Sequence, residues 1–222
     1  MNKKIAFTLA ETLITIGIIG VVAAITIPNL IKNYQKSQIE LSLKRSYSIM
    51  TQALKMSIAE NGDIDGWKLP QNDTADECHD FVKTYIFPYM KVINDCGVEQ
   101  GCFGNPEYLM NGSIAENIND TKGKTIKFTT IDGINIAVYT SGTSNTIHIY
   151  FDVNGNKKPN TRGKDIFEFI IPVFTEQNNT EHILLPNGYY DNTNDCKTNN
   201  SGFVCAKLIF NNNWKFPKDY PW

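Results

Sequence analysis

The chain has 222 residues, of which 41% are hydrophobic and 20% are charged, so it has enough apolar residues to bury a globular core. The formal net charge of -2 does not indicate a nucleic-acid-binding surface, because such surfaces carry a basic excess. The five cysteines and three histidines contain no Cys-x-x-Cys pair, so the usual ligand spacing of a zinc site is missing. The sequence also lacks the common hydrolase, P-loop and dinucleotide-binding motifs. We therefore do not expect an enzyme.

A long apolar segment lies near the N-terminus. It has no charged residue over Leu13–Ile27. Counted over Phe7–Ile31, it has about the ~20 residues that a helix needs to cross a bilayer. Lys3 and Lys4 precede it, so the positive-inside rule predicts a cytoplasmic N-terminus and an extracytoplasmic remainder.

Two simpler interpretations of this segment fit less well. A secretory signal would have a shorter apolar core, and the nearest small-residue cleavage site would be Ala23-Ala24. A plain signal anchor does not account for Glu11, since an acidic residue inside a membrane helix costs at least ~2.5 kcal/mol. Such a residue needs a cationic partner.

The N-terminus resembles a known family. Lys3-Lys4-Ile5-Ala6 followed by Phe7-Thr8-Leu9-Ala10-Glu11 is similar to the cleavage and methylation motif of type IV prepilins and type II secretion pseudopilins. The resemblance implies that a prepilin peptidase cuts between Ala6 and Phe7 and N-methylates Phe7. It also implies that Glu11 pairs with the N-terminal amine of a neighbouring subunit, and that Pro28 is a helix break. Ala6 departs from the glycine usual before the cut.

This resemblance implies a structural subunit, either a minor pilin or a pseudopilin, of a type IV pilus or a type II secretion filament. Its partners would be other subunits, the prepilin peptidase and the bacterial inner membrane, which the chain would cross once. The alternative is a membrane-anchored module at a filament tip that binds calcium, a surface or DNA.

The apolar segment continues into a predicted amphipathic helix. Its apolar positions recur every three or four residues: Ile39, Leu43, Tyr47, Met50, Leu54 and Ile58. Asn61-Gly62 is a stop signal. The expected organisation is a leader (1–6), a transmembrane and assembly helix (7–31), its amphipathic half (32–60) and a globular domain (61–222).

The globular domain is predicted to be a helix followed by a β-meander. Thr74-Ala-Asp-Glu77 is a capping box for the second helix. From Lys124 the apolar pattern changes to period two and predicts four strands, at about 125–131, 134–139, 146–151 and 167–172. Asp132-Gly133 is typical of a two-residue hairpin turn. Together with the long helix, this predicts an α+β fold of the pilin-like type.

A loop rich in acidic and amide side chains follows the third strand. It spaces side-chain oxygens along the chain, as a calcium loop does: Asp152, Asn154, Asn156, Asn160 and Asp165. Gly163 stands where an EF-hand has its bidentate Glu. The competing interpretation, which we favour, is a polar turn whose Asp and Asn side chains bond their own backbone. No cofactor is required, and calcium is the candidate.

The cysteines indicate disulfides in an exported domain. Cys96 and Cys102 are far enough apart to close a small loop, although Cys78 could compete for either of them. The pilin resemblance implies that Cys196 and Cys205 close a C-terminal loop. Residues 203–210 are predicted to form a last strand, and the aromatic residues after it to cover an edge of the core.

Overall fold

The computed structural model describes residues 8–72, 74–104, 106–115, 118, 124–140, 146–173, 183–189 and 196–222. The chain divides into two compact units, Met1–Gln38 and Ile39–Trp222, and each is considered by itself. The predicted α+β class is confirmed: a long apolar N-terminal helix is followed by a six-stranded antiparallel sheet.

The first helix, α1, spans Leu9–Asn61. In the second unit it buries the predicted stripe: Ile39, Leu43, Met50 and Leu54 are at most 7% exposed. The helix ends where expected, because Gly62 adopts a φ of 81°. Left-handed backbone of this kind stops a helix and favours glycine.

Pro28 does not break α1 in this structure, although the pilin resemblance implied a break there. The helix continues through Pro28 in its interior. A proline ring removes one backbone N–H donor, and neighbouring turns can keep such a helix together. The side chain of Thr26 donates to the Val22 carbonyl (2.9 Å) and that of Asn29 to the Ile25 carbonyl (3.4 Å), one turn away in each case.

The second helix, α2 (Ala75–Tyr85), begins at the predicted cap. The Glu77 N–H donates to the Thr74 hydroxyl at 3.3 Å. The Glu77 carboxylate does not complete the box on Thr74 and instead accepts from the Asn72 N–H at 2.8 Å. Phe81 and Val82 are buried as predicted.

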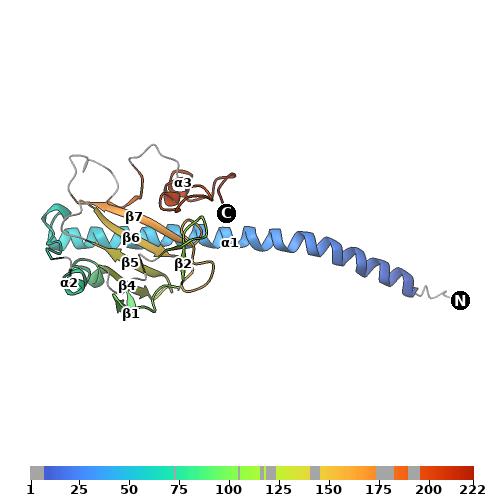
Figure 1. Cartoon of the computed structure of the whole chain (residues 1–222), viewed down its shortest axis with the longest axis horizontal. Coiled ribbons are helices and arrows are strands. Elements are labelled where there is room, and N and C mark those ends of the chain that lie inside the picture. Colours follow the sequence, from blue (N-terminus) through green and yellow to red (C-terminus); the bar gives the residue numbers. More distant parts are fainter. Residues whose placement is uncertain are drawn as a thin grey trace. The chain divides into compact units, whose positions relative to one another are not determined.

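The sheet is a meander with short additions at its edges (Figure 1). Its order is β1-β4-β5-β6-β7-β8, with every pairing antiparallel. The bounds are β1 Val92–Gly97, β4 Thr125–Thr130, β5 Asn135–Tyr139, β6 Thr146–Asp152, β7 Ile166–Pro172 and β8 Leu185–Pro186. A separate two-stranded sheet joins β2 (Glu107–Tyr108) to β3 (Ile114–Ala115). The four predicted strands are confirmed as β4 to β7.

Both faces of the six-stranded sheet are covered. Residues alternate between faces along a strand, and one set packs with α1, α2 and α3 in the main core. The opposite face carries a smaller cluster, here called the outer layer: Cys102, Phe103, Ile118, Ala137, Tyr150 and Ile166. This second covering explains why nearly every residue of β4 and β5 is buried.

Two local predictions were wrong. Residues 203–210 form no strand; helix α3 spans Cys205–Asn211, where the buried Cys205, Ala206 and Ile209 have helical spacing. The hairpin turn between β4 and β5 is also longer than the two residues predicted: the Thr130 N–H donates to the Ile134 carbonyl at 3.0 Å, so residues 131–133 form the turn. Gly133 donates to the Thr130 carbonyl and has a φ of 76°, the left-handed residue that three-residue turns require.

The aromatic residues after α3 cover the core edge as predicted. Trp214 packs on Tyr47 of α1 with ring centroids 4.7 Å apart. Tyr220 is 6% exposed. The Glu40 carboxylate holds this tail by accepting from Lys215 Nζ and from the Phe216 N–H, both at 2.8 Å.

Candidate functional site

The start of α1 is closed by a reciprocal cap. Thr8 donates its backbone N–H to Glu11 Oε2 at 2.8 Å, and its hydroxyl donates to the same oxygen at 2.9 Å. In return, the Glu11 N–H donates to the Thr8 hydroxyl at 3.3 Å. This is a capping box of the Thr-x-x-Glu type. The Thr-x-x-Glu spacing is present in the sequence, but the pilin resemblance implies only a role for Glu11 in filament assembly.

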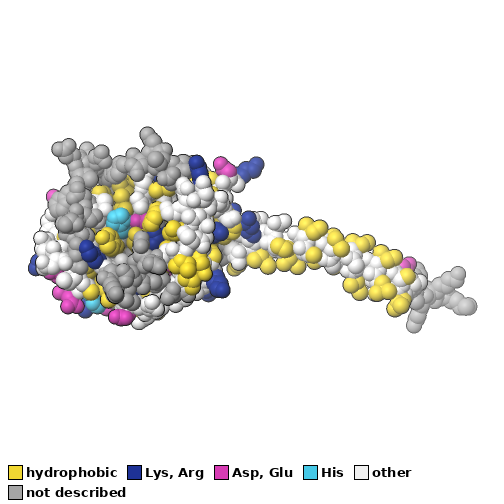
Figure 2. Space-filling model, in the orientation of Figure 1, with side chains coloured by type: hydrophobic (Ala, Val, Ile, Leu, Met, Phe, Trp, Pro, Cys, Tyr) yellow, Lys and Arg dark blue, Asp and Glu magenta, His cyan; other side chains and the backbone are white. Residues whose placement is uncertain are grey.

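The first unit presents its apolar side chains outward, as Figure 2 shows along the first part of α1. From Leu13 to Ile31 the large apolar residues are each at least half exposed. By length and composition α1 could cross a membrane. The predicted cleavage residues Ala6 and Phe7 lie outside the described residues, so the described part of the predicted motif runs from Thr8 to Glu11.

A second candidate site is the segment Asp152–Asp165, here called the acidic–amide loop. It leaves the end of β6 and returns into β7. Asp165 organises it, since its Oδ1 accepts the Thr161 N–H at 2.6 Å and its Oδ2 accepts the Asn160 N–H at 2.8 Å. Asn154 Nδ2 also donates to Asp165 Oδ2, at 3.1 Å. These contacts are what the polar-turn interpretation requires.

Asp152 is held much more weakly. Its side chain is fully buried, yet its two contacts are long: Oδ1 accepts from the Asn154 N–H and Oδ2 from Asn135 Nδ2, both at 3.4 Å. Burial, and next the neighbouring Asp165 carboxylate, raise the pKa of Asp152 to about 8. Burial also raises the pKa of Asp165, to about 6, against the opposing effect of its N–H donors.

Neither carboxylate has a cationic partner within the described part of the chain. The ion pairs there involve other residues. Two buried carboxylates that repel each other are unfavourable unless they are protonated or meet a positive charge. With its pKa raised to about 8, Asp152 is therefore mainly protonated and uncharged in the folded chain below that pH.

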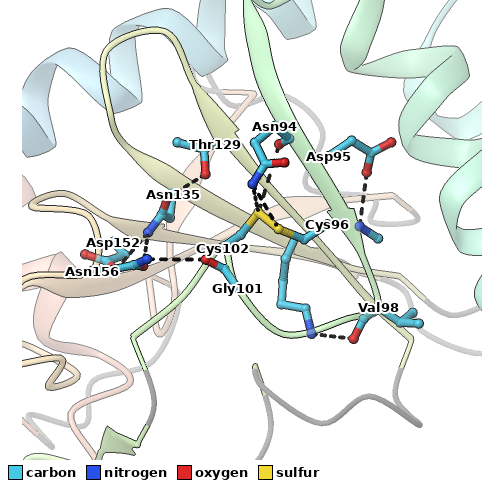
Figure 3. The surroundings of a disulfide bond; sticks show 12 residues. Asn94, Asp95, Cys96, Val98, Gly101, Cys102, Thr129, Asn135, Asp152 and Asn156 are labelled. Atoms are coloured by element: carbon cyan, nitrogen blue, oxygen red, sulfur yellow. Dashed lines mark hydrogen bonds between the residues drawn. A yellow bond between two sulfur atoms is a disulfide. The ribbon is translucent and has the colours of Figure 1, made fainter.

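The amide residues of the loop fall into two groups. Asn154 Oδ1 and Asn160 Oδ1 are buried and accept no hydrogen bond from the described residues. Asn156 instead joins the loop to its surroundings: its Oδ1 accepts from Asn135 Nδ2 at 2.9 Å and its Nδ2 donates to the Gly101 carbonyl at 3.3 Å. Figure 3 shows this row running from Thr129 through Asn135 to Asp152 and Asn156, and on to the loop of the Cys96–Cys102 disulfide.

An open hollow of about 500 Å³ lies beside this row. It is lined by Gln100, Gly101, Phe103, Gly104, Asn156, Lys158 and Asn160. The Asn160 side chain is packed tightly there, since a Cβ added to Gly104 would lie 2.3 Å from it. The loop thus borders solvent although its carboxylates are buried.

An EF-hand arrangement is excluded at Gly163. Its φ is 79°, and a Cβ there would lie 2.5 Å from Met110 Cε, so no glutamate fits. In the described ranges no three His, Cys, Asp or Glu residues cluster as metal ligands. Any metal would therefore depend on the two carboxylates together with amide oxygens.

Sequence reasoning missed a set of ionisable side chains that are buried or half-buried beside the outer layer. Arg162 pairs with Glu107, and His148 Nδ1 lies 2.7 Å from Glu168 Oε1. Lys127 is fully buried and donates its Nζ to the Val98 carbonyl at 2.6 Å. For Lys127, His148 and Glu168, alternation with apolar neighbours along β4, β6 and β7 could have indicated this burial. No such pattern surrounds Arg162, which lies outside the named strands.

Both predicted disulfides are present, Cys96–Cys102 and Cys196–Cys205. Cys78 takes part in neither, and its buried side chain lies in the main core. The sequence left open whether Cys78 replaces Cys96 or Cys102 in this disulfide, and the structure shows that it does not.

A family model described as a family of unknown function (DUF6613) matches residues 29–222. The match begins directly after Pro28 and so leaves out most of the apolar segment. No curated protein and no solved structure shows significant similarity to the chain.

Proposed function

The chain belongs to the DUF6613 family, a family of unknown function, and we propose that it is a structural subunit of a bacterial envelope filament. It would be a minor pilin or pseudopilin whose α1 is anchored in the inner membrane and packs against other subunits. The domain from Ile39 onward would lie outside the cytoplasm, and its two disulfides suit that compartment. Lys3 and Lys4 before the apolar segment favour the same orientation.

The observation that carries this proposal is Glu11, an acidic residue at the start of α1 that is followed by an uncharged stretch from Thr12 to Ile31. Thr8 satisfies part of its hydrogen-bonding capacity but adds no positive charge. A carboxylate inside the membrane has a free-energy cost, and this cost remains until a cation neutralises the charge. A free amine on Phe7, created by cleavage after Ala6, would supply that cation from a neighbouring copy.

A matched pair of substitutions separates the charge of Glu11 from its role as a cap. Gln serves in a capping box as Glu does, so Glu11→Gln removes the charge alone, whereas Glu11→Ala removes both. We expect both variants to be processed by a co-expressed prepilin peptidase and both to lose most filament assembly. Thr15→Val, in the same helix, is the control and should assemble normally.

Intact-mass spectrometry and sheared-filament yield are the measurements. Processing should shorten the chain by its first six residues and leave N-methyl-Phe7. A retained Met1, or a cut near Ala24, would overturn the prepilin assignment. Wild-type assembly of Glu11→Gln would show that Glu11 acts as a helix cap and not as an assembly charge.

An anchored binding module remains the second candidate. The acidic–amide loop favours it, because its two buried carboxyl groups and two amide oxygens without a donor among the described residues could bind a cation. Calcium binding would be compatible with either role.

A further inference from the structure

Three polar side chains on the outer-layer face of the sheet form a continuous row of contacts. Thr146 Oγ1 lies 3.1 Å from His148 Nε2, and His148 Nδ1 lies 2.7 Å from Glu168 Oε1. Thr146 and His148 are two residues apart on β6 and therefore share one face, and Glu168 belongs to the neighbouring β7. A hydroxyl, an imidazole and a carboxylate are thus in contact in that order.

The chemistry of these groups assigns the protons. A carboxylate only accepts hydrogen bonds, so His148 Nδ1 carries the proton that it donates to Glu168. In a neutral imidazole the other ring nitrogen is then an acceptor. The Thr146 hydroxyl therefore donates to His148 Nε2. This is the arrangement in which a histidine, oriented by a third group, takes the proton of a nucleophile.

Burial divides the three residues as a nucleophilic site requires. Glu168 is only 4% exposed, whereas the side chain of His148 is 25% exposed. Thr146 is half-buried. The carboxylate is thus shielded from water, while the hydroxyl and the imidazole can meet a small molecule.

Apolar side chains surround the hydroxyl and the imidazole on the same face. Tyr139 of β5 and Ile170 of β7 lie directly opposite His148. Pro172 lies opposite Thr146. Opposite residues on one face are neighbours, and the Tyr139 ring is 5.7 Å from the His148 ring. All three are half-buried, so they offer an apolar surface to a substrate.

We propose that Thr146, His148 and Glu168 hydrolyse carboxylic esters with a small apolar acyl group. The Thr146 oxygen attacks the ester carbonyl carbon while His148 Nε2 takes the hydroxyl proton. The bond from this carbon to the alcohol oxygen then breaks, and His148 returns the proton to that oxygen. Water releases the carboxylic acid from acyl-Thr146 by the same two steps. The activity does not depend on the filament role.

Glu168 is a positioning residue, because it contacts His148 and not the substrate. Its charge stabilises the imidazolium that forms during the attack. The sequence has none of the common hydrolase motifs, but sets of this kind are recognised by geometry and occur on unrelated folds.

The test treats the full-length chain in detergent with p-nitrophenyl butyrate. Peptide mass spectrometry after an acid quench should find a butyryl group on Thr146, and release of p-nitrophenol gives the rate. Thr146→Val and His148→Gln should each lower kcat/KM about tenfold or more, since a positioned base contributes about 10²–10⁴-fold. Thr146→Ser keeps a hydroxyl in place and should retain the activity.

Glu168→Gln tests the positioning role. It should lower kcat and leave KM unchanged, because the substituted side chain does not contact the ester. A merely structural role would lower the Tm without this separation of the two constants.

His79→Gln is the matched control for unspecific reaction of imidazoles. The His79 side chain is 26% exposed, close to the value for His148, and its Nε2 lies 2.7 Å from Asp95 Oδ2. Its Nε2 therefore meets a carboxylate where that of His148 meets a hydroxyl. This variant should hydrolyse the ester as the wild type does.

Three outcomes would overturn the proposal. They are a wild-type reaction that leaves no acyl group on Thr146, a Thr146→Val variant that keeps the wild-type rate, and equal losses in His79→Gln and His148→Gln. The last result would mean that exposed imidazoles react with the ester wherever they lie.

Discussion

Arg162 and Glu107 form an ion pair at the outer layer with only 2% and 0% of their side chains exposed. Arg162 contributes through its Nε. Its Nη1 and Nη2, and Glu107 Oε2, are buried and have no hydrogen-bond partner in the described part of the chain. The guanidinium also lies over the Phe203 ring, 4.3 Å from its centroid. Burial raises the pKa of Glu107, against the lowering effect of Arg162.

We predict that substituting one residue of this pair destabilises the folded chain more than substituting both by apolar residues. Arg162→Met or Glu107→Leu alone leaves one buried charge and should lower the free energy of unfolding by about 3–5 kcal/mol. The double variant should recover most of that loss, because an apolar pair needs no desolvated charge. Urea denaturation of the four proteins measures the coupling.

Lys215→Met is the control, since Lys215 is 61% exposed in its pair with Glu40. Exposed pairs are typically worth about 1 kcal/mol or less. Additive losses in the double variant would contradict the prediction.

We further predict that stability without calcium falls as the pH rises. The pKa of Asp152 is raised to about 8 in the folded chain, from about 3.9 when unfolded. The folded state therefore retains a proton that the unfolded state releases, so its stability is fully present below about pH 4 and declines until about pH 8. In EGTA the Tm of the wild type should fall across this range.

Asp152→Asn isolates the effect, because Asp165 and Glu107 also have raised pKa values. The variant should show a flatter Tm profile between pH 5 and pH 8. Since one pKa unit is worth about 1.4 kcal/mol, we expect the two profiles to separate by several degrees. Parallel profiles would show that Asp152 is already ionised in the folded chain.

The last prediction concerns Gly163, which closes the acidic–amide loop against α3. A Cβ there would lie 2.5 Å from Met110 Cε and 2.8 Å from Cys205 Sγ, on a backbone with φ 79°. Gly163→Ala should therefore destabilise the chain by about 1–3 kcal/mol.

Gly66→Ala is the matched control, because a Cβ at Gly66 would have no atom within 4 Å. Thermal unfolding of both variants is the measurement. Equal melting temperatures would mean that the loop can move away from α3 without loss.

The sequence predicted those helices and strands in which the buried residues recur at one regular spacing. The stripe from Ile39 to Leu54 and the alternating β4 to β7 were of this kind. Strand β1 escaped prediction because Val92–Gly97 is an edge strand with two register shifts and no alternating pattern. Residues 203–210 misled because a short apolar run fits a strand or a helix equally well.

The outer layer and part of the loop could not be predicted for a different reason. Lys127, Glu168 and Arg162 are charged, and charged residues are normally placed at the surface. Their burial depends on the segment that contributes Cys102, Phe103 and Ile118 to the outer layer. This segment is not adjacent to them in the sequence and covers the sheet only after the chain has folded. Asp152 and Asp165 were predicted as candidate site residues from their spacing. That Asp165 accepts three hydrogen bonds of 2.6–3.1 Å, whereas Asp152 accepts two of 3.4 Å, could be seen only in the structure.

The placement of the cysteines has a consequence for how the chain matures. The disulfides join residues only six and nine positions apart in the sequence, whereas Cys78 is fully buried, with its Sγ 3.7 Å from the Thr140 carbonyl oxygen. Exchange needs a thiolate that can reach a disulfide sulfur. Once the chain has folded, the buried Cys78 thiol is therefore kept from attacking either disulfide, and one covalent isomer is retained.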